Sequence, residues 1–134
     1  MKIFSLFLIS LFSLQCYSQQ KPKLNLPESI NRGKDIYIAQ CLTCHLDKGE
    51  GIEDVYPPLA KADYLMVDKK RSIEQVLYGA KGELKVNGKT YNGEMSAFDL
   101  TDQQTSDVLN YIRNSFGNKG SAVTPEEVKA ARKK

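Results

Sequence analysis

The chain has few of the side chains that usually bind metals, with one histidine and three cysteines among 134 residues, and it has no tryptophan. A single imidazole excludes metal or catalytic sites that require several histidines. Neither sign of charge dominates, because 19 lysine and arginine residues stand against 16 aspartate and glutamate residues. A formal charge of +3 is not the strongly basic composition of nucleic-acid-binding proteins, so no nucleic acid partner is expected.

The overall composition is that of an ordinary globular protein. Hydrophobic residues make up 41% and charged residues 26% of the chain. These values argue against a disordered chain, a collagen-like repeat and a membrane protein with several spans. The length corresponds to about one domain.

The N-terminus has the pattern of a cleaved signal peptide over residues 1–18. Lys2 provides the positive start, and the apolar stretch Ile3–Leu14 is shorter than the roughly 20 residues of a transmembrane helix. Cleavage after Ser18 is favoured because Cys16 and Ser18 are small residues at the two positions that define such sites. The protein is therefore expected to be exported and periplasmic.

Lipid attachment at Cys16 is the alternative for this terminus, and it would tether the protein to a membrane. Gln15 argues against it, because a small residue is typical at that position. After the signal peptide we expect a flexible leader over residues 19–27, a folded domain over 28–118, and a C-terminal tail with a short helix over 119–134.

Hydrophobic periodicity predicts an all-α fold with a small β-hairpin. Helices are expected over residues 28–40, 72–79 and 101–117, with a weaker helical turn over 60–67. Residues 84–91 alternate around an Asn-Gly pair, which is typical of a two-residue hairpin turn.

Capping boxes are predicted where the second and third of these helices and the tail helix begin. They are Ser72 with Gln75, Thr101 with Gln104, and Thr124 with Glu127. A solvated tail helix is expected, and residues 117–121 before it form a loose joint.

The sequence Cys41-Leu42-Thr43-Cys44-His45 at the end of the first helix is the attachment signature of a c-type haem. Two thiols three residues apart can each add to one vinyl group, and the next residue places its imidazole on the iron. His45 is the only histidine, so it is the only nitrogen ligand of this kind that the chain offers.

Other uses of a Cys-x-x-Cys pair fit the sequence less well. A structural zinc site needs four ligands, and the chain without its signal peptide has no further Cys or His. A dithiol redox motif belongs in an α/β sequence, which this is not. A disulfide between Cys41 and Cys44 would close a very small loop and stabilise little.

The second axial ligand of the iron is predicted to be Met95. Without the signal peptide only Met66 and Met95 offer a thioether, and Met66 lies in an apolar run that indicates a core position. Met95 follows the hairpin in a glycine-containing stretch predicted as a loop, from which it can reach the face of the ring opposite His45. Met95 as a buried filler of the core is the alternative.

From Glu28 to Asn118 the sequence resembles the class I monohaem c-type cytochromes. The resemblance implies a cytochrome c fold, in which interlocking first and last helices surround one covalent haem. The helix contacts of that family match Gly33 and Tyr37 in the first helix, and Val108 and Tyr111 in the last.

The family's ligands and their supports also map onto this sequence. Pro57 matches the proline twelve residues after the haem histidine, whose carbonyl accepts the other N–H of the imidazole. The methionine ligand of the family maps onto Met95. Arg71 or Tyr91 is hypothesised to bind a haem propionate.

The C-terminal sequence looks like a bacterial subgroup found beside, or fused to, periplasmic nitrite reductases and quinone-dependent dehydrogenases. The chain departs from mitochondrial relatives, whose lysine-rich docking ring it lacks, because Asp47, Glu50, Glu53 and Asp54 follow the motif. We therefore expect a monomeric one-electron carrier, not an enzyme, with a redox protein as partner (an oxidase, reductase or dehydrogenase) and no small-molecule substrate.

Two other functions remain open from the sequence. If Met95 does not bind iron, an open coordination position would allow a haem-based sensor or a peroxide-reactive protein. If no haem is bound, the chain would be a small helical binding module with an oxidised Cys41–Cys44 pair.

Overall fold

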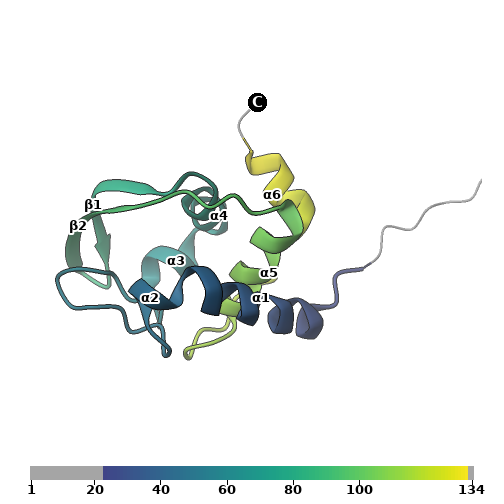
Figure 1. Cartoon of the computed structure of the whole chain (residues 1–134), viewed down its shortest axis with the longest axis horizontal. Helices are drawn as coiled ribbons and strands as arrows, with labels where there is room; N and C mark the ends of the chain where they lie inside the picture. Colours follow the sequence, from purple (N-terminus) through teal and green to yellow (C-terminus); the bar gives the residue numbers. More distant parts are fainter. Residues whose placement is uncertain (1–22, 133–134) are drawn as a thin grey trace, which may run out of the picture.

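The computed structural model describes residues 23–132. Its elements are α1 (Leu26–Gln40), α2 (Leu42–His45), α3 (Asp63–Val67), α4 (Lys69–Tyr78), β1 (Ala80–Val86), β2 (Lys89–Met95), α5 (Asp102–Arg113) and α6 (Pro125–Ala131), shown in Figure 1. Helices with one two-stranded antiparallel sheet confirm the predicted mixture of elements. The predicted signal peptide, Cys16 and residues 19–22 of the leader lie outside the described residues. Within those residues, no helix has the length and apolarity needed to cross a membrane.

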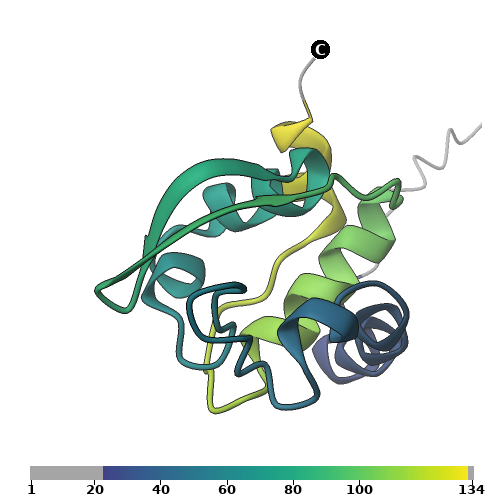
Figure 2. The ribbon, with the colours of Figure 1, turned by 60° about the vertical axis from the view of Figure 1, so that its left-hand side comes forward.

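The first and fifth helices, α1 and α5, pack against each other (Figure 2). Gly33 makes this approach possible, because a Cβ atom there would lie 1.9 Å from the carbonyl oxygen of Asp107. The ring of Tyr37 is 1% exposed and its centroid lies 5.3 Å from that of Tyr111. The small residue and the aromatic residues singled out in the sequence therefore meet in the fold.

α1 begins two residues before the predicted start. Asn25 is its N-cap and accepts a hydrogen bond from the backbone N–H of Glu28, and Pro27 lies in the first turn. At α5 the predicted capping box of Thr101 and Gln104 is confirmed. α5 ends at Arg113, four residues before Gly117.

The predicted start of α4 is wrong. Asp68 is the N-cap, and its side chain accepts a hydrogen bond from the backbone N–H of Arg71. Ser72 instead lies inside α4, and its hydroxyl donates to the carbonyl oxygen of Leu65 in α3 at 2.7 Å. An aspartate four residues earlier therefore caps this helix, and Ser72 joins α4 to the end of α3. The predicted end is confirmed, since Gly79 is the C-cap with φ 76°.

The hairpin is longer than predicted. Its ladder pairs Ala80 with Met95 at one end and Val86 with Lys89 at the Asn-Gly turn. Met95 is thus the last residue of β2, not part of a loop after the hairpin as expected. One side chain on each strand, Val86 on β1 and Tyr91 on β2, is buried in the core, so this sheet covers one side of the helical core.

The tail is part of the packed structure rather than a solvated end. Val123 and Val128 are 0% exposed. In Figure 2 the segment between α5 and α6 returns past α5 to the C-terminal helix. Along this path a Cβ atom on Gly120 would lie 3.0 Å from the Met66 side chain, and the Gly120 N–H donates to the carbonyl oxygen of Arg113 at 2.8 Å. The predicted joint at residues 117–121 is therefore held in place, and the side chain of Met66 in α3 lies close to it.

Candidate functional site

A cavity of about 330 Å³ lies between the Cys-x-x-Cys-His turn and the hairpin. Cys41, Cys44 and His45 line one part of it, and Met95 at the end of β2 lines another. The structure therefore brings together the four residues that the sequence predicted would act together.

The His45 side chain is oriented by a backbone carbonyl. Its Nδ1 lies 3.0 Å from the carbonyl oxygen of Pro57, so Nδ1 carries the proton and donates it. Nε2 is then the nitrogen with a lone pair for a metal. Burial lowers the pKa of His45, and this outweighs the opposite effect of the hydrogen bond to Pro57. The imidazole is therefore neutral near pH 7, which is the form that binds metals.

The two cysteines lie one helical turn from each other beside His45. Cys41 ends α1, and its carbonyl oxygen accepts hydrogen bonds from the N–H groups of Cys44 and His45. Both thiols are half-buried and neither forms a disulfide. Burial, together with the nearby Cys44, raises the pKa of the Cys41 thiol to about 11. A protonated thiol oxidises slowly, so Cys41 does not have the lowered pKa of a redox-active thiol.

Met95 is positioned by the end of α4. A Cβ atom on Gly79 would lie 2.1 Å from the carbonyl oxygen of Met95, so the two backbones are in close contact. Three residues further on, the N–H of Phe98 donates to the carbonyl oxygen of Val76 at 3.2 Å. The backbone from the Met95 carbonyl to Phe98 is thus held against the end of α4.

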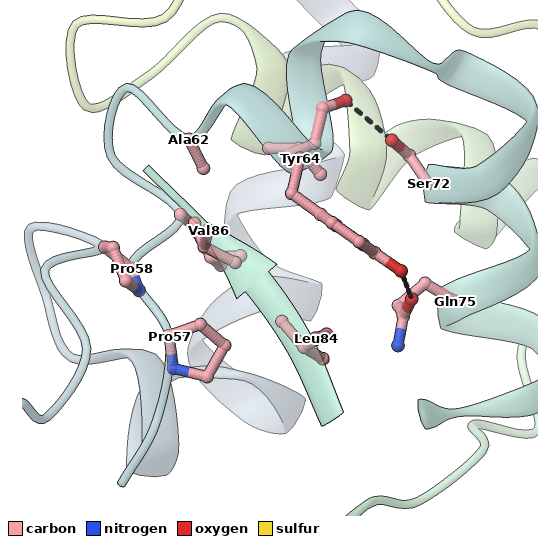
Figure 3. Close-up of a pocket in the computed structure, with 10 residues that line it drawn as sticks. Pro57, Pro58, Ala62, Tyr64, Ser72, Gln75, Leu84 and Val86 are labelled. Atoms are coloured by element: carbon pink, nitrogen blue, oxygen red, sulfur yellow. Dashed lines mark hydrogen bonds between the residues drawn. The ribbon is translucent and has the colours of Figure 1, made fainter. Parts of the chain in front are cut away.

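Two smaller cavities adjoin the first and share lining residues with it. One, of about 60 Å³, lies between the Pro57 loop, α3, α4 and β1, as Figure 3 shows. The other, of about 50 Å³, is lined by residues that include His45, Met95 and Phe98. Together the three spaces form an apolar crevice with few polar groups in its walls.

The two residues hypothesised to bind a propionate have different positions. Tyr91 is 6% exposed and lines the large cavity. Within residues 23–132 its hydroxyl makes no hydrogen bond. Arg71 lines none of the three cavities. Its guanidinium lies 4.0 Å over the Tyr64 ring and donates to the Tyr64 carbonyl oxygen, while its buried Nε has no partner within the described chain.

Several wall residues were not predicted. Gln75 lines both smaller cavities, and its Oε1 accepts a hydrogen bond from the Tyr64 hydroxyl at 3.3 Å (Figure 3). Gln75 was predicted as the capping-box partner of Ser72 and therefore not as a wall residue. With Asp68 as the cap, helical spacing alone would have placed Gln75 on the same face as Ser72 and Val76. Leu84 also lines the large cavity, and only the hairpin's position reveals this.

The acidic residues after the motif are partly neutralised. Lys89, next to the hairpin turn, forms ion pairs with Glu53 at 2.8 Å and Asp54 at 2.9 Å. The Glu50 carboxylate accepts a hydrogen bond from the N–H of Lys48. These contacts join the loop after His45 to the hairpin, on opposite sides of the cavity.

The donor set of this crevice fits a covalently attached haem. It combines one neutral imidazole and one thioether as ligands for a single iron, and two thiols on the same turn for covalent attachment. The walls between them are mostly apolar.

Comparisons with known proteins agree with this chemistry. Residues 30–116 match the family model for Cytochrome c. Cytochrome c-552 of Thermus thermophilus is 42% identical over 112 residues, which cover 76% of this chain and 85% of that protein. The cytochrome c subunit of a quinone alcohol dehydrogenase from Gluconobacter oxydans is 30% identical over 66% of this chain, but only 19% of that subunit is covered. The fructose dehydrogenase cytochrome subunit of Gluconobacter japonicus is 31% identical over 75% of this chain and 22% of its own length.

Proposed function

The chain belongs to the cytochrome c family, and from this premise we propose that His45 and Met95 are the axial ligands of its haem iron. Family membership makes the protein an electron carrier with covalently bound haem c. The observation that supports the ligand assignment is that the chain's one histidine and Met95 line the same cavity.

Cys41 and Cys44 would hold the haem by two thioether bonds, each formed by adding a thiol across a vinyl group, a reaction that consumes no external oxidant. Their place at the α1–α2 junction fixes the attached edge relative to His45, one residue further along the chain.

His45 is held in the correct tautomer by the Pro57 carbonyl, 3.0 Å from Nδ1. This hydrogen bond directs Nε2 to the iron and raises the basicity of the imidazole. Met95 provides a thioether from the end of β2. A histidine–methionine pair raises the reduction potential relative to stronger donor pairs.

The haem iron supplies one-electron chemistry by changing between the ferric and ferrous states. The side chains around it exclude water and other ligands. Phe98, Val76 and Leu59 contribute apolar wall. With His45 and Met95 both bound, the iron would have no position left for a substrate.

Two polar groups without partners in the described chain are suited to the haem carboxylates. The Tyr91 hydroxyl lies in the cavity wall, and the Arg71 Nε is buried beside Tyr64. Buried donors nearly always have a hydrogen-bond partner. As the sequence suggested, Arg71 or Tyr91 would provide a hydrogen bond to a haem propionate.

The partners are redox proteins, such as an oxidase, a reductase or a dehydrogenase. The similarity to dehydrogenase cytochrome subunits supports this class. The protein acts as an exported, periplasmic monomer without a small-molecule substrate, and lipid attachment at Cys16 is the alternative that would tether it. Contacts with the partner are small and transient, as is usual for electron transfer.

Replacement of each methionine in the mature chain tests the ligand assignment. Ferric iron bound by methionine sulfur has a weak long-wavelength absorption band. We expect Met95→Ala to abolish this band and Met66→Ala to retain it, because Met66 packs against the tail. The visible spectrum of the two purified, haem-loaded variants measures this.

The same spectra separate the alternatives. Loss of the band in Met66→Ala but not in Met95→Ala would contradict the assignment. A parent protein without the band would indicate an open iron and therefore a sensor or peroxide-reactive protein. A parent without any haem spectrum would indicate a binding module.

A further inference from the structure

The C-terminal segment (residues 119–132) follows the part of the chain that matches the family model, which ends at residue 116. It nevertheless supports the residues that connect β2 to α5 in two ways, through α4 and by a direct contact. We name Met95, the last residue of β2, and the connecting residues up to 101 the Met95 segment.

The first support is α4. The end of this helix touches the Met95 segment through Gly79 and through the Val76 carbonyl oxygen. α4 is in turn bound to the C-terminal segment near both of its own ends. Lys69 Nζ forms an ion pair with Glu127 at 2.7 Å and donates to the Ala122 carbonyl oxygen at 2.9 Å.

At the other end of α4, the Tyr78 hydroxyl donates to the carbonyl oxygen of Ala131 at 3.2 Å. Ala131 and Val128 are buried on the inner face of α6. The helix that supports Met95 therefore cannot shift without moving α6.

The second support is a direct contact with the Met95 segment. Arg132 Nη2 donates to the carbonyl oxygen of Leu100 at 2.6 Å, and its Nε donates to Asp102 at 2.6 Å. Leu100 lines one of the small cavities next to Met95. One guanidinium thus bonds the last part of the Met95 segment and the first residue of α5.

The C-terminal segment is itself fixed in the core. The N–H of Val123 donates to Asn110 Oδ1 at 2.7 Å, and the Asn110 amide donates to the Val123 carbonyl oxygen at 2.9 Å. Both residues are 0% exposed. Arg132 therefore acts from an anchored helix and not from a free end.

We propose that the C-terminal segment holds Met95 on the iron and that Arg132 is a positioning residue for this ligand. The inference rests on the proposed function, in which Met95 is an axial ligand. A thioether is a weak donor, so small displacements of its backbone release it before the fold is lost.

Imidazole binding to the full-length, haem-loaded ferric protein tests this proposal. Free imidazole occupies the iron when Met95 leaves, so its affinity reports how firmly the methionine is held. We expect Arg132→Ala to increase this affinity roughly five-fold, the change in equilibrium constant that loss of one typical hydrogen bond produces. Arg132→Lys keeps the charge beside Asp102 but not the two-pronged geometry, and it should recover part of the parent value.

Lys129→Ala is the matched control, because it removes one positive charge from the exposed face of the same helix. Its imidazole affinity should stay within about two-fold of the parent's. Far-UV circular dichroism on unfolding measures global stability separately, since a purely structural role would lower the unfolding midpoint without changing the native imidazole affinity.

Equal imidazole affinities in Arg132→Ala and Lys129→Ala would overturn the proposal, whatever the unfolding midpoints are. Failure of the proposed function looks different. In that case the parent lacks the sulfur–iron band, or Met95→Ala leaves the spectrum unchanged, and the positioning role falls with the ligand assignment.

Discussion

The Arg71 guanidinium has one buried nitrogen, Nε, for which the described chain provides no acceptor. If it faces a haem carboxylate, replacing Arg71 by glutamine removes a positive charge close to the iron. We expect the reduction potential to fall by tens of millivolts, because the ferric state carries one more positive charge and a nearby cation disfavours it. Spectroelectrochemical titration of the variant measures the change.

Lys70→Gln provides the control for Arg71→Gln. Lys70 is the preceding residue of α4, its side chain is 73% exposed, and it pairs with Glu74. It loses the same charge in solvent, where screening removes most of its effect on the iron. Equal potentials in the two variants would refute a role for Arg71 at the haem.

Individual site residues differ in how well the sequence predicts them. The proposal for Cys41, Cys44 and His45 follows from the spacing of the motif alone, because covalent attachment and ligation would fix that spacing. The proposal for Met95 follows from the small number of methionines that compete with it. Leu84 could not be predicted as a wall residue, because only the position of the hairpin brings it to the crevice. Gln75 was missed because Ser72 was predicted to be the cap, although helical spacing places it on the same face as Val76.

The connection between α4 and the hairpin gives a test of how backbone contact holds Met95. Gly79 and Gly82 both have positive φ, 76° and 85°, so alanine at either position introduces a similar backbone strain of about 1 kcal/mol. Only at Gly79 would the new Cβ meet another backbone, 2.1 Å from the Met95 carbonyl oxygen. We therefore expect Gly79→Ala to weaken the sulfur–iron band strongly.

Gly82→Ala is the matched comparison, because a Cβ there meets nothing within 4 Å. It should lower the unfolding midpoint slightly and leave the band intact. Both measurements are made on the same ferric samples, by visible absorption and by circular dichroism. A band that weakens equally in both variants would mean that strain in the hairpin, and not contact with Gly79, controls the ligand.

The sequence predicted helices and strands correctly where a short local motif determines the structure. The Thr101 box and the Asn-Gly turn are examples, and both are present in the structure. The prediction of Ser72 as the N-cap of α4 was wrong because its hydroxyl donates a hydrogen bond to Leu65 in α3, a partner that helical periodicity does not reveal. α5 stops before Gly117 because Phe116, with φ 57°, turns back to pack on Tyr37 and Tyr111.

Across the molecule as a whole, the C-terminal segment binds elements far apart in sequence, and this attachment depends on charge. Glu127 caps α6 and pairs with Lys69. Burial alone would raise the pKa of Glu127, but its hydrogen bonds with Lys69 Nζ and with the N–H of Thr124 hold that pKa below its ordinary value of 4.5. The stabilisation from this carboxylate is therefore complete above pH 4.5 and disappears as the pH falls through the lowered pKa of the folded state.

Glu127→Gln isolates this contribution, because glutamine can still accept the hydrogen bond from Thr124 but carries no charge to protonate. At pH 7 we expect the free energy of unfolding of the parent to be higher than that of the variant, but by less than about 1 kcal/mol. The difference is small because the Glu127 side chain is 40% exposed and solvent screens its pair with Lys69. This difference should become smaller as the pH falls below 4.5 and through the lowered pKa of the folded state. Urea unfolding of both proteins at pH 7, 5, 4 and 3 measures it, and other acidic groups such as Asp63 cancel in the comparison. A difference that persists unchanged at pH 3 would mean that Glu127 stabilises α6 through its neutral hydrogen bonds, and that the ion pair with Lys69 contributes nothing to holding the C-terminal segment on α4.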